Sequence, residues 1–393
     1  MLRHLVAIAA LFVAVPVAAP ARAELPVAIA YLRLEVDRPP VLSNLDPVPE
    51  DLGIAGAEIA VADNRTTGSF LGHAYSLSVV SVPPGGDLTG AAREVLMSAR
   101  LILIEADPAA ILSVADLPEA QDALLFNVAS GAESLRSTDC RANLLHTAPE
   151  DAARADALMQ VLQKKQWQDT ALIVGPKPAD RAFAEALRRS AAKFAIRILA
   201  EKDWTFDTDL RDSTMDEVPR FTQDFPDHDV ILIADETDDF ARYVEHNTWL
   251  PRPVAGSGGM VATAWSSVIE SWGAVQLQNR FEKQAGRDMR GQDYAAWTAV
   301  RAIGEAVTRT NASDPATIRT YLLNPDFQMD GFKGRGLSFR AWNGQMRQPI
   351  AVVNARALVT LTPIEGFLHQ RVEMDSLGLD EPESACTAFK EVQ

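Results

Sequence analysis

Short apolar runs alternate with longer amphipathic segments along most of the chain. Runs of strand length lie at residues 27–32, 75–82, 101–106, 125–128, 170–175, 196–201, 229–235, 254–255 and 350–353. Segments with apolar side chains at helical spacing lie at residues 52–64, 91–98, 151–166, 180–194 and 240–247. Strands that are apolar throughout and alternate with helices indicate parallel sheets covered on both faces. The pattern therefore predicts an α/β protein with doubly wound parallel sheets.

The second half of the chain is organised around residues 254–305. This stretch holds a glycine-rich turn, residues 256–259, and three of the seven tryptophans, and it closes in a helix that begins near Asp293. We interpret it as the return from a second α/β block to the first. A crevice between two such blocks is a place where a small ligand binds.

Turn and cap signals predict the remaining boundaries. Gly68 is expected beyond the end of the first helix, and Ser313 is expected to cap a helix at residues 314–322. Polar residues 207–216 predict a loop. Asn343-Gly344 predicts a turn between two β segments.

The N-terminus predicts export. A basic start at Arg3 and His4 precedes thirteen apolar residues, 5–17, which are too few to span a bilayer. Residues 21–23 read Ala-Arg-Ala, an A-x-A cleavage site. Residues 1–23 therefore predict a secretory signal peptide. The product is expected in a bacterial periplasm, with no membrane insertion after cleavage.

Composition and charge exclude some functions. The 393 residues, 47% of them hydrophobic, allow two core-bearing domains. The formal net charge is -16, and loss of Arg3 and Arg22 with the signal peptide makes it -18. Such a charge argues against nucleic-acid partners, which need a basic face.

The chain lacks the motifs of common enzymes and metal sites. It has no phosphate-binding loop, no G-x-G-x-x-G, no H-E-x-x-H and no G-x-S-x-G nucleophile elbow. The six histidines show no ligand spacing. The acidic cluster at residues 235–239 lacks the spacing of a calcium loop and is interpreted as the start of the next helix. We therefore expect neither an enzyme nor a bound metal or cofactor.

The two cysteines, Cys140 and Cys386, leave two possibilities open. An exported protein lies in a compartment that permits disulfides, and a bridge would pin the polar C-terminal tail to the body. The alternative is two unpaired thiols.

Several motifs, in order and spacing, resemble those of a known family. They are residues 53–64, residues 294–306, and a glycine-rich segment with Phe332-Lys333-Gly334, Leu337-Ser338-Phe339 and Asn343-Gly344. In these the chain resembles the type I periplasmic substrate-binding proteins of ABC transporters, of the branched-chain amino acid kind. The resemblance implies two lobes with a ligand cleft between them. Lobe 1 would comprise residues 24–147 and 262–340, lobe 2 residues 148–261 and 341–370, and a tail residues 371–393.

A narrower resemblance concerns a subgroup associated with PQQ-dependent alcohol oxidation. It rests on residues 270–273, 286–289, 293–297 and 377–380. It implies that PQQ or a related aromatic carboxylate is the ligand, held by a monomer that delivers it to an ABC permease and ATPase in the inner membrane. The loop at residues 127–134 departs from the pattern of the amino acid binders. The alternatives are an amino acid ligand, or a sensor or scavenger of the same fold.

Ligands of doubly wound sheets bind beyond the carboxyl ends of the strands. PQQ, a flat quinone with three carboxylates, also needs cations and an aromatic face. These two rules nominate ligand-binding candidates at Tyr31, Arg33, Asn127, Ser130, Lys177, Arg181, Asp235, Ser257, Trp265 and Trp297. Arg181 could instead lie on a solvated helix face, and Trp297 could be a core residue.

Overall fold

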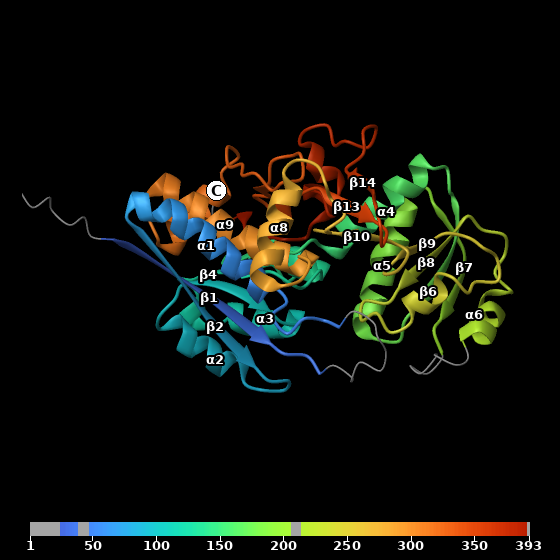
Figure 1. Cartoon of the computed structure of the whole chain (residues 1–393), viewed down its shortest axis with the longest axis horizontal. Coiled ribbons are helices and arrows are strands. Elements are labelled where there is room, and N and C mark those ends of the chain that lie inside the picture. The colour runs from blue at the N-terminus through green and yellow to red at the C-terminus, as the bar shows by residue number, and fades with distance from the viewer. Residues whose placement is uncertain (1–23, 38–46, 206–213, 391–393) are drawn as a thin grey trace, which may run out of the picture.

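The computed structural model describes residues 24–37, 47–205 and 214–390. The predicted signal peptide and residues 207–213 of the predicted loop lie outside the described residues. The chain forms two α/β lobes, which lie at the left and right of Figure 1. We call lobe 1 the five-stranded sheet with the elements packed on it, and lobe 2 the seven-stranded sheet with its helices.

Lobe 1 is built on a parallel sheet with strand order β2-β1-β3-β4-β5. Its strands are β1 (Leu25–Leu34), β2 (His73–Val82), β3 (Leu101–Glu105), β4 (Leu124–Asn127) and β5 (Leu144–His146). β3 and β4 are almost wholly apolar because helices cover both sheet faces.

One face of this sheet packs against α1 (Ile54–Leu71), α8 (Ala274–Ala285), α9 (Gly291–Thr310) and α10 (Pro315–Leu322). The other face packs against α2 (Leu88–Leu96) and α3 (Pro108–Ala115). The long return from lobe 2 therefore completes the core of lobe 1. A hairpin of β11 (Ser338–Phe339) and β12 (Met346–Arg347) turns near Asn343-Gly344 and packs on the same core.

Lobe 2 is built on a mixed sheet with strand order β14-β13-β10-β9-β8-β6-β7. Its strands are β6 (Asp169–Val174), β7 (Arg197–Asp203), β8 (Val230–Ala234), β9 (Val254–Gly256), β10 (Met260–Thr263), β13 (Ile350–Val353) and β14 (Leu358–Thr362). The strands from β10 to β14 pair antiparallel, and the others pair parallel. Helices α4 (Asp151–Lys164) and α5 (Pro178–Lys193) cover one face, with α6 (Thr214–Thr222) and α7 (Ala241–Val244) towards the other.

Three crossings between the lobes in the described part of the chain meet at one buried lysine. Lys333 Nζ donates to the carbonyl oxygens of Ala264 at 2.9 Å and Pro349 at 2.7 Å, and to Gln348 Oε1 at 3.0 Å. Gln348 Nε2 in turn donates to the Thr147 carbonyl at 2.8 Å. Thr147, Ala264 and Pro349 belong to the three different crossings, so this network holds them at one hinge.

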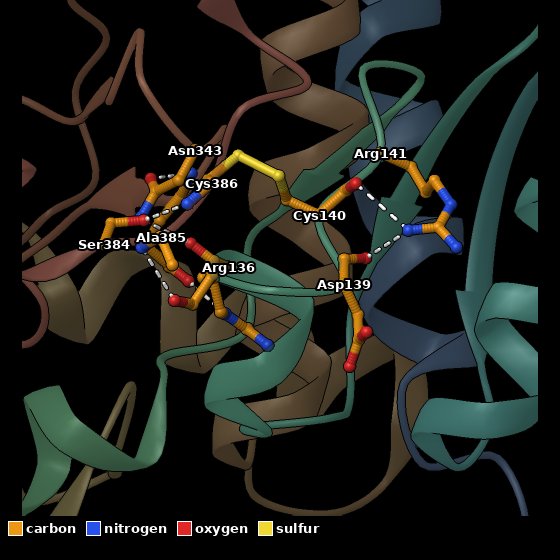
Figure 2. The surroundings of a disulfide bond; sticks show 10 residues. Arg136, Asp139, Cys140, Arg141, Asn343, Ser384, Ala385 and Cys386 are labelled. Carbon is orange, nitrogen blue, oxygen red and sulfur yellow. Dashed lines mark hydrogen bonds between the residues drawn. A yellow bond between two sulfur atoms is a disulfide. The ribbon is translucent and has the colours of Figure 1, made fainter.

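The C-terminal tail runs across both lobes. It contains two short 3₁₀ helices, η3 (Glu373–Ser376) and η4 (Glu381–Glu383). Beyond η4, Cys386 is disulfide-bonded to Cys140 of lobe 1 (Figure 2). Two further 3₁₀ helices, η1 (Pro118–Ala120) and η2 (Glu133–Arg136), lie in the loops of lobe 1.

The structure differs from the sequence predictions at several boundaries. Helix α1 continues through Gly68 to Leu71, because the left-handed residue that ends it is Gly72, with a φ of +77°. Gly68 instead allows a close approach to β2, where a Cβ would be 2.8 Å from the His73 carbonyl oxygen. Asp314, not Ser313, caps α10 by accepting from the Thr317 N–H. Helix α7 is shorter than predicted. The elements α3, α6, α8, β5, β10 and β14 have no counterpart in the predictions, and α6 begins at Thr214, inside the segment predicted as a loop.

Candidate functional site

Polar side chains gather at the carboxyl ends of the strands in both lobes. In lobe 1, the fully buried Asn127 ends β4 and organises the loop after it. Its Oδ1 accepts from the N–H groups of Ala129 and Ser130 at 3.2 and 2.9 Å, and its Nδ2 donates to the Ser130 carbonyl at 2.8 Å. Asn127 therefore shapes the loop, while the half-buried Ser130 lies on it.

Tyr31 and Arg33 occupy the end of β1. The buried Tyr31 hydroxyl donates to Glu105 Oε2 at 2.7 Å, and burial together with the Glu105 charge raises the pKa of Tyr31 well above its ordinary value. Arg33 donates to the Glu50 carbonyl at 2.6 Å and pairs with Glu35 at 3.4 Å. Both side chains are thus held by neighbours within lobe 1.

In lobe 2, Lys177 follows β6 and Asp235 follows β8. Lys177 Nζ lies 2.6 Å from Asp239 Oδ2 and donates to Thr237 Oγ1 at 3.0 Å. Asp235 is buried and accepts from the backbone N–H groups of Asp239, Phe240 and Ala241. The acidic cluster therefore satisfies the start of the next helix, as its sequence indicates.

A charged cluster of lobe 2 centres on Arg154, which sequence reasoning missed. Its guanidinium forks onto Glu236 at 2.6 and 3.0 Å and reaches Asp151 Oδ1 at 3.1 Å. The Ser257 hydroxyl donates to Glu236 Oε1 at 2.9 Å. Burial acts to raise the pKa of Glu236, but the charge and hydrogen bonds of Arg154 outweigh it and lower that pKa.

This cluster places opposite charges side by side in a partly buried site. The side chains of Arg154, Asp151 and Glu236 are 18%, 14% and 19% exposed, and Arg154 also lies 4.4 Å above the Phe183 ring. A ligand with both a cationic and an anionic group could bind both members of such an ion pair, so that no charge would be left unpaired.

The two lobes touch beside this cluster. The Asp151 N–H donates to the Gly131 carbonyl at 2.9 Å, across the lobe boundary. Glu133 of lobe 1 is ion-paired and hydrogen-bonded to Arg189 on α5 of lobe 2. Burial raises the pKa of Glu133 to about 7, with a further contribution from the charges of Glu150 and Asp151 and against the pull of Arg189.

The two nominated tryptophans lie elsewhere. Trp265 stacks on Tyr294 with ring centres 4.9 Å apart, and its Nε1 donates to Gln278 at 3.2 Å. Trp297 also stacks on Tyr294, with ring centres 5.7 Å apart. Both are 2% exposed in the core of lobe 1. In contrast to the sequence-based expectation, neither indole offers a free face at the sheet edges, because both are packed inside lobe 1 against Tyr294 of α9.

Arg181 also lies apart from the cluster. Its side chain is 57% exposed on α5 and lies 3.5 Å from Asp203. This arrangement agrees with the solvated helix face that was the alternative interpretation. The structure therefore brings together Ser257 with the newly found Asp151, Arg154 and Glu236. Lys177 and Asp235 lie at the neighbouring strand ends.

Within the described residues, no group of three histidine, cysteine, aspartate or glutamate side chains is placed to hold a metal ion. No described helix is long and apolar enough to cross a membrane.

Comparison with solved structures finds many with the same architecture at low sequence identity. The branched-chain amino acid ABC transporter periplasmic ligand-binding protein of Burkholderia xenovorans superposes with a TM-score of 0.69 at 15% identity, over 92% of this chain and 100% of that one. The leucine-, isoleucine-, valine-, threonine- and alanine-binding protein of Brucella ovis gives 0.66 at 14%, over 88% and 93%. A Rhodopseudomonas palustris solute-binding protein in complex with benzoate gives 0.62 at 10%, over 92% and 99%.

The chain has the two-lobed fold of the type I periplasmic binding proteins. No protein-family model matches the sequence, and no curated protein matches it either. At these identities the likeness establishes the fold of the chain. The expected two-lobed α/β architecture is therefore confirmed, whereas the sheet of lobe 2 is mixed and not wholly parallel as predicted, because β13 and β14 return to it antiparallel.

Proposed function

We propose that the protein is the exported solute-binding component of an ABC transporter, which acts in the periplasm and hands its ligand to an inner-membrane permease and ATPase. The observation that carries this proposal is the pair of polar strand edges that meet at Gly131 and Asp151 beside a single hinge. A ligand bound between such edges contacts both lobes and so favours their closed arrangement. The predicted signal peptide supports export.

The ligand class that we propose first is PQQ or a related aromatic carboxylate. The resemblance to the subgroup associated with PQQ-dependent alcohol oxidation supports it. The solute-binding protein in complex with benzoate supports the capacity of this fold for an aromatic acid. Arg154, Lys177 and Arg189 would supply the cations. Each of them is now paired with a carboxylate of the protein, so an acidic ligand would have to displace Glu236, Asp239 or Glu133.

That pairing favours a second candidate, an amino acid. A zwitterion offers its carboxylate to Arg154 and its ammonium to Glu236 or Asp151, so both charges of the cluster remain compensated. A ligand without net charge is neither attracted nor strongly repelled by the negative net charge of the protein. The structure of a binding protein from Desulfitobacterium hafniense in complex with leucine supports this alternative for the fold.

Titration of the mature protein separates these ligands. PQQ, benzoate and leucine are added in turn while tryptophan fluorescence and the thermal midpoint are followed. Saturation by PQQ at one equivalent supports the aromatic carboxylate, whereas a thermal shift with leucine alone supports the amino acid. No response to any of the three, nor to a panel of other amino acids, would contradict both ligand classes.

Arg154→Lys tests whether the identified ligand binds at this cluster. Lysine keeps the charge but loses the two-pronged contact of the guanidinium, so we expect roughly tenfold weaker binding, about 1.4 kcal/mol. Arg188→Lys is the matched control, because Arg188 lies on α5 and pairs with Glu185 and Glu201 within lobe 2. If Arg154→Lys and the wild type bind the ligand with equal affinity in calorimetry, Arg154 does not belong to the binding site.

Transport is tested in cells. A strain that lacks this protein should lose uptake of the labelled ligand and regain it on complementation. Binding in vitro with unchanged uptake would instead support a sensor or scavenger.

A further inference from the structure

The C-terminal tail is anchored in both lobes. We define the strap as residues 377–386. At its start Leu377 is buried in the hydrophobic core of lobe 2. At its end Cys386, and beyond it Phe389, are buried in the core of lobe 1. A single short segment therefore spans from one core to the other, in addition to the three crossings at the hinge.

Polar contacts reinforce the anchor on lobe 2, and Arg340, which follows β11, holds the same point beside the hinge by donating to the Leu379 carbonyl at 3.1 Å and to Glu150 Oε1 at 2.7 Å. The Gly378 N–H donates to Asp156 Oδ2 at 2.9 Å, and Lys193 Nζ donates to the Gly378 carbonyl at 3.3 Å. Lys193 is also paired with Asp156 at 2.9 Å. Gly378 has a φ of +81°, and a Cβ there would lie 1.8 Å from Glu150 Oε1, so only glycine fits at this point.

The anchor on lobe 1 is covalent. Cys386 is bonded to Cys140, and next to this bond Ser384 Oγ donates to the Arg136 carbonyl at 2.8 Å (Figure 2). The Ala385 N–H donates to Ser137 Oγ at 2.9 Å. Thermal motion can release the hydrogen bonds but not the disulfide, which fixes this end of the strap to lobe 1.

Between the anchors, part of the strap is coiled into a short helix. It contains η4, which is closed by a capping box between Asp380 and Glu383. A 3₁₀ helix rises about 2 Å per residue, against about 3.3 Å for an extended chain, so η4 keeps the strap shorter than an extended segment of the same length. A cavity of about 580 Å³ separates part of the strap from the lobes and is lined by Ser134, Arg189 and Leu379 among others. The strap therefore acts as a tether rather than as a packed layer.

We propose that the strap limits how far the two lobes open, and that the Cys140–Cys386 disulfide sets this limit. Movement that draws Cys140 away from Asp156 stretches the strap, so the open states of largest separation are lost from the ensemble of the oxidised protein. Reduction of the disulfide leaves only noncovalent contacts at the lobe 1 end and widens the range of opening. This inference does not depend on the identity of the ligand.

Small-angle X-ray scattering of the ligand-free protein tests the strap. The Cys140→Ser/Cys386→Ser double variant should show a larger radius of gyration than the oxidised wild type, while its circular dichroism spectrum stays unchanged. The wild type treated with a reductant should shift in the same direction. Identical scattering from a folded double variant and the oxidised wild type would overturn the proposal.

A second variant weakens the lobe 2 anchor without touching the disulfide. Lys193→Met removes the ammonium that joins Asp156 to Gly378 and should also increase the radius of gyration. Arg188→Met is its matched control, because it removes a cation of the same helix whose partners lie within lobe 2. If the double cysteine variant fails to fold, the comparison of Lys193→Met with Arg188→Met tests the proposal. Equal radii of gyration for these two variants would contradict the proposal that the strap limits opening.

Discussion

Glu133 is a titratable residue that takes part in the contact between the lobes. Its carboxylate faces Arg189 across the lobe boundary and lies near Glu150 and Asp151. Burial raises its pKa from 4.5 to about 7, so the folded protein holds a proton there that the unfolded chain has lost. The folded state therefore gains from this group at low pH, and the gain disappears as the pH rises through about 7.

We expect Glu133→Gln to change the pH dependence of stability. The stability of the wild type relative to the variant should fall between pH 5 and pH 8, because glutamine does not titrate. Thermal midpoints measured at each pH for both proteins test this, with a difference of a few degrees expected across the range. Glu94→Gln, at an exposed site of α2, should follow the wild type. Parallel curves for wild type and Glu133→Gln would contradict the raised pKa.

At the scale of elements, the hinge depends on Lys333. Its ammonium has three oxygen acceptors and lies 4.3 Å above the Tyr294 ring, so its hydrogen atoms are all used although burial lowers its pKa well below the ordinary value. Lys333→Met would leave two carbonyls and the Gln348 amide oxygen without this donor. We expect a loss of about 2–3 kcal/mol in the free energy of unfolding, measured in urea.

The exposed Lys164→Met at the end of α4 is the control for Lys333→Met and should stay within about 0.5 kcal/mol of the wild type. If both substitutions cost the same, the three crossings do not depend on Lys333.

The sequence predicted long elements well and pairings across the chain poorly. The apolar runs correctly predicted β3, β6 and β8, because parallel strands that are buried on both faces need no polar face. The spacing of Asp151 and Arg154 was visible as a pair on one helix turn. Their partner Glu236 is 82 residues further from Arg154, and local periodicity carries no information about such a contact. Trp265 and Trp297 were misplaced for a different reason: their contacts lie within the return segment, but its sequence did not show which face of α9 is buried, and both indoles stack there on Tyr294.

At the scale of the whole molecule, the arrangement of the lobes rests on a few close contacts. The hinge network joins the three crossings, and the Gly131–Asp151 hydrogen bond joins the lobes beside the charged cluster. Gly131 permits this approach because it lacks a side chain. A Cβ at that position would lie 2.2 Å from Asp151 Oδ1, and the Asp151 carboxylate is held in place by Arg154.

Gly131→Ala should therefore separate the lobes at this point without disturbing either core. Since a ligand between the lobes binds best when both contact it, a smaller population of the competent arrangement lowers the apparent affinity in proportion. We expect roughly tenfold weaker binding of the ligand identified by titration, about 1.4 kcal/mol, with a nearly unchanged thermal midpoint of the free protein. Gly336→Ala is the control, because its nearest neighbour is the flexible Gln328 side chain at 3.3 Å. Weaker binding in both variants, or in neither, would show that the contact at Gly131 does not govern closure.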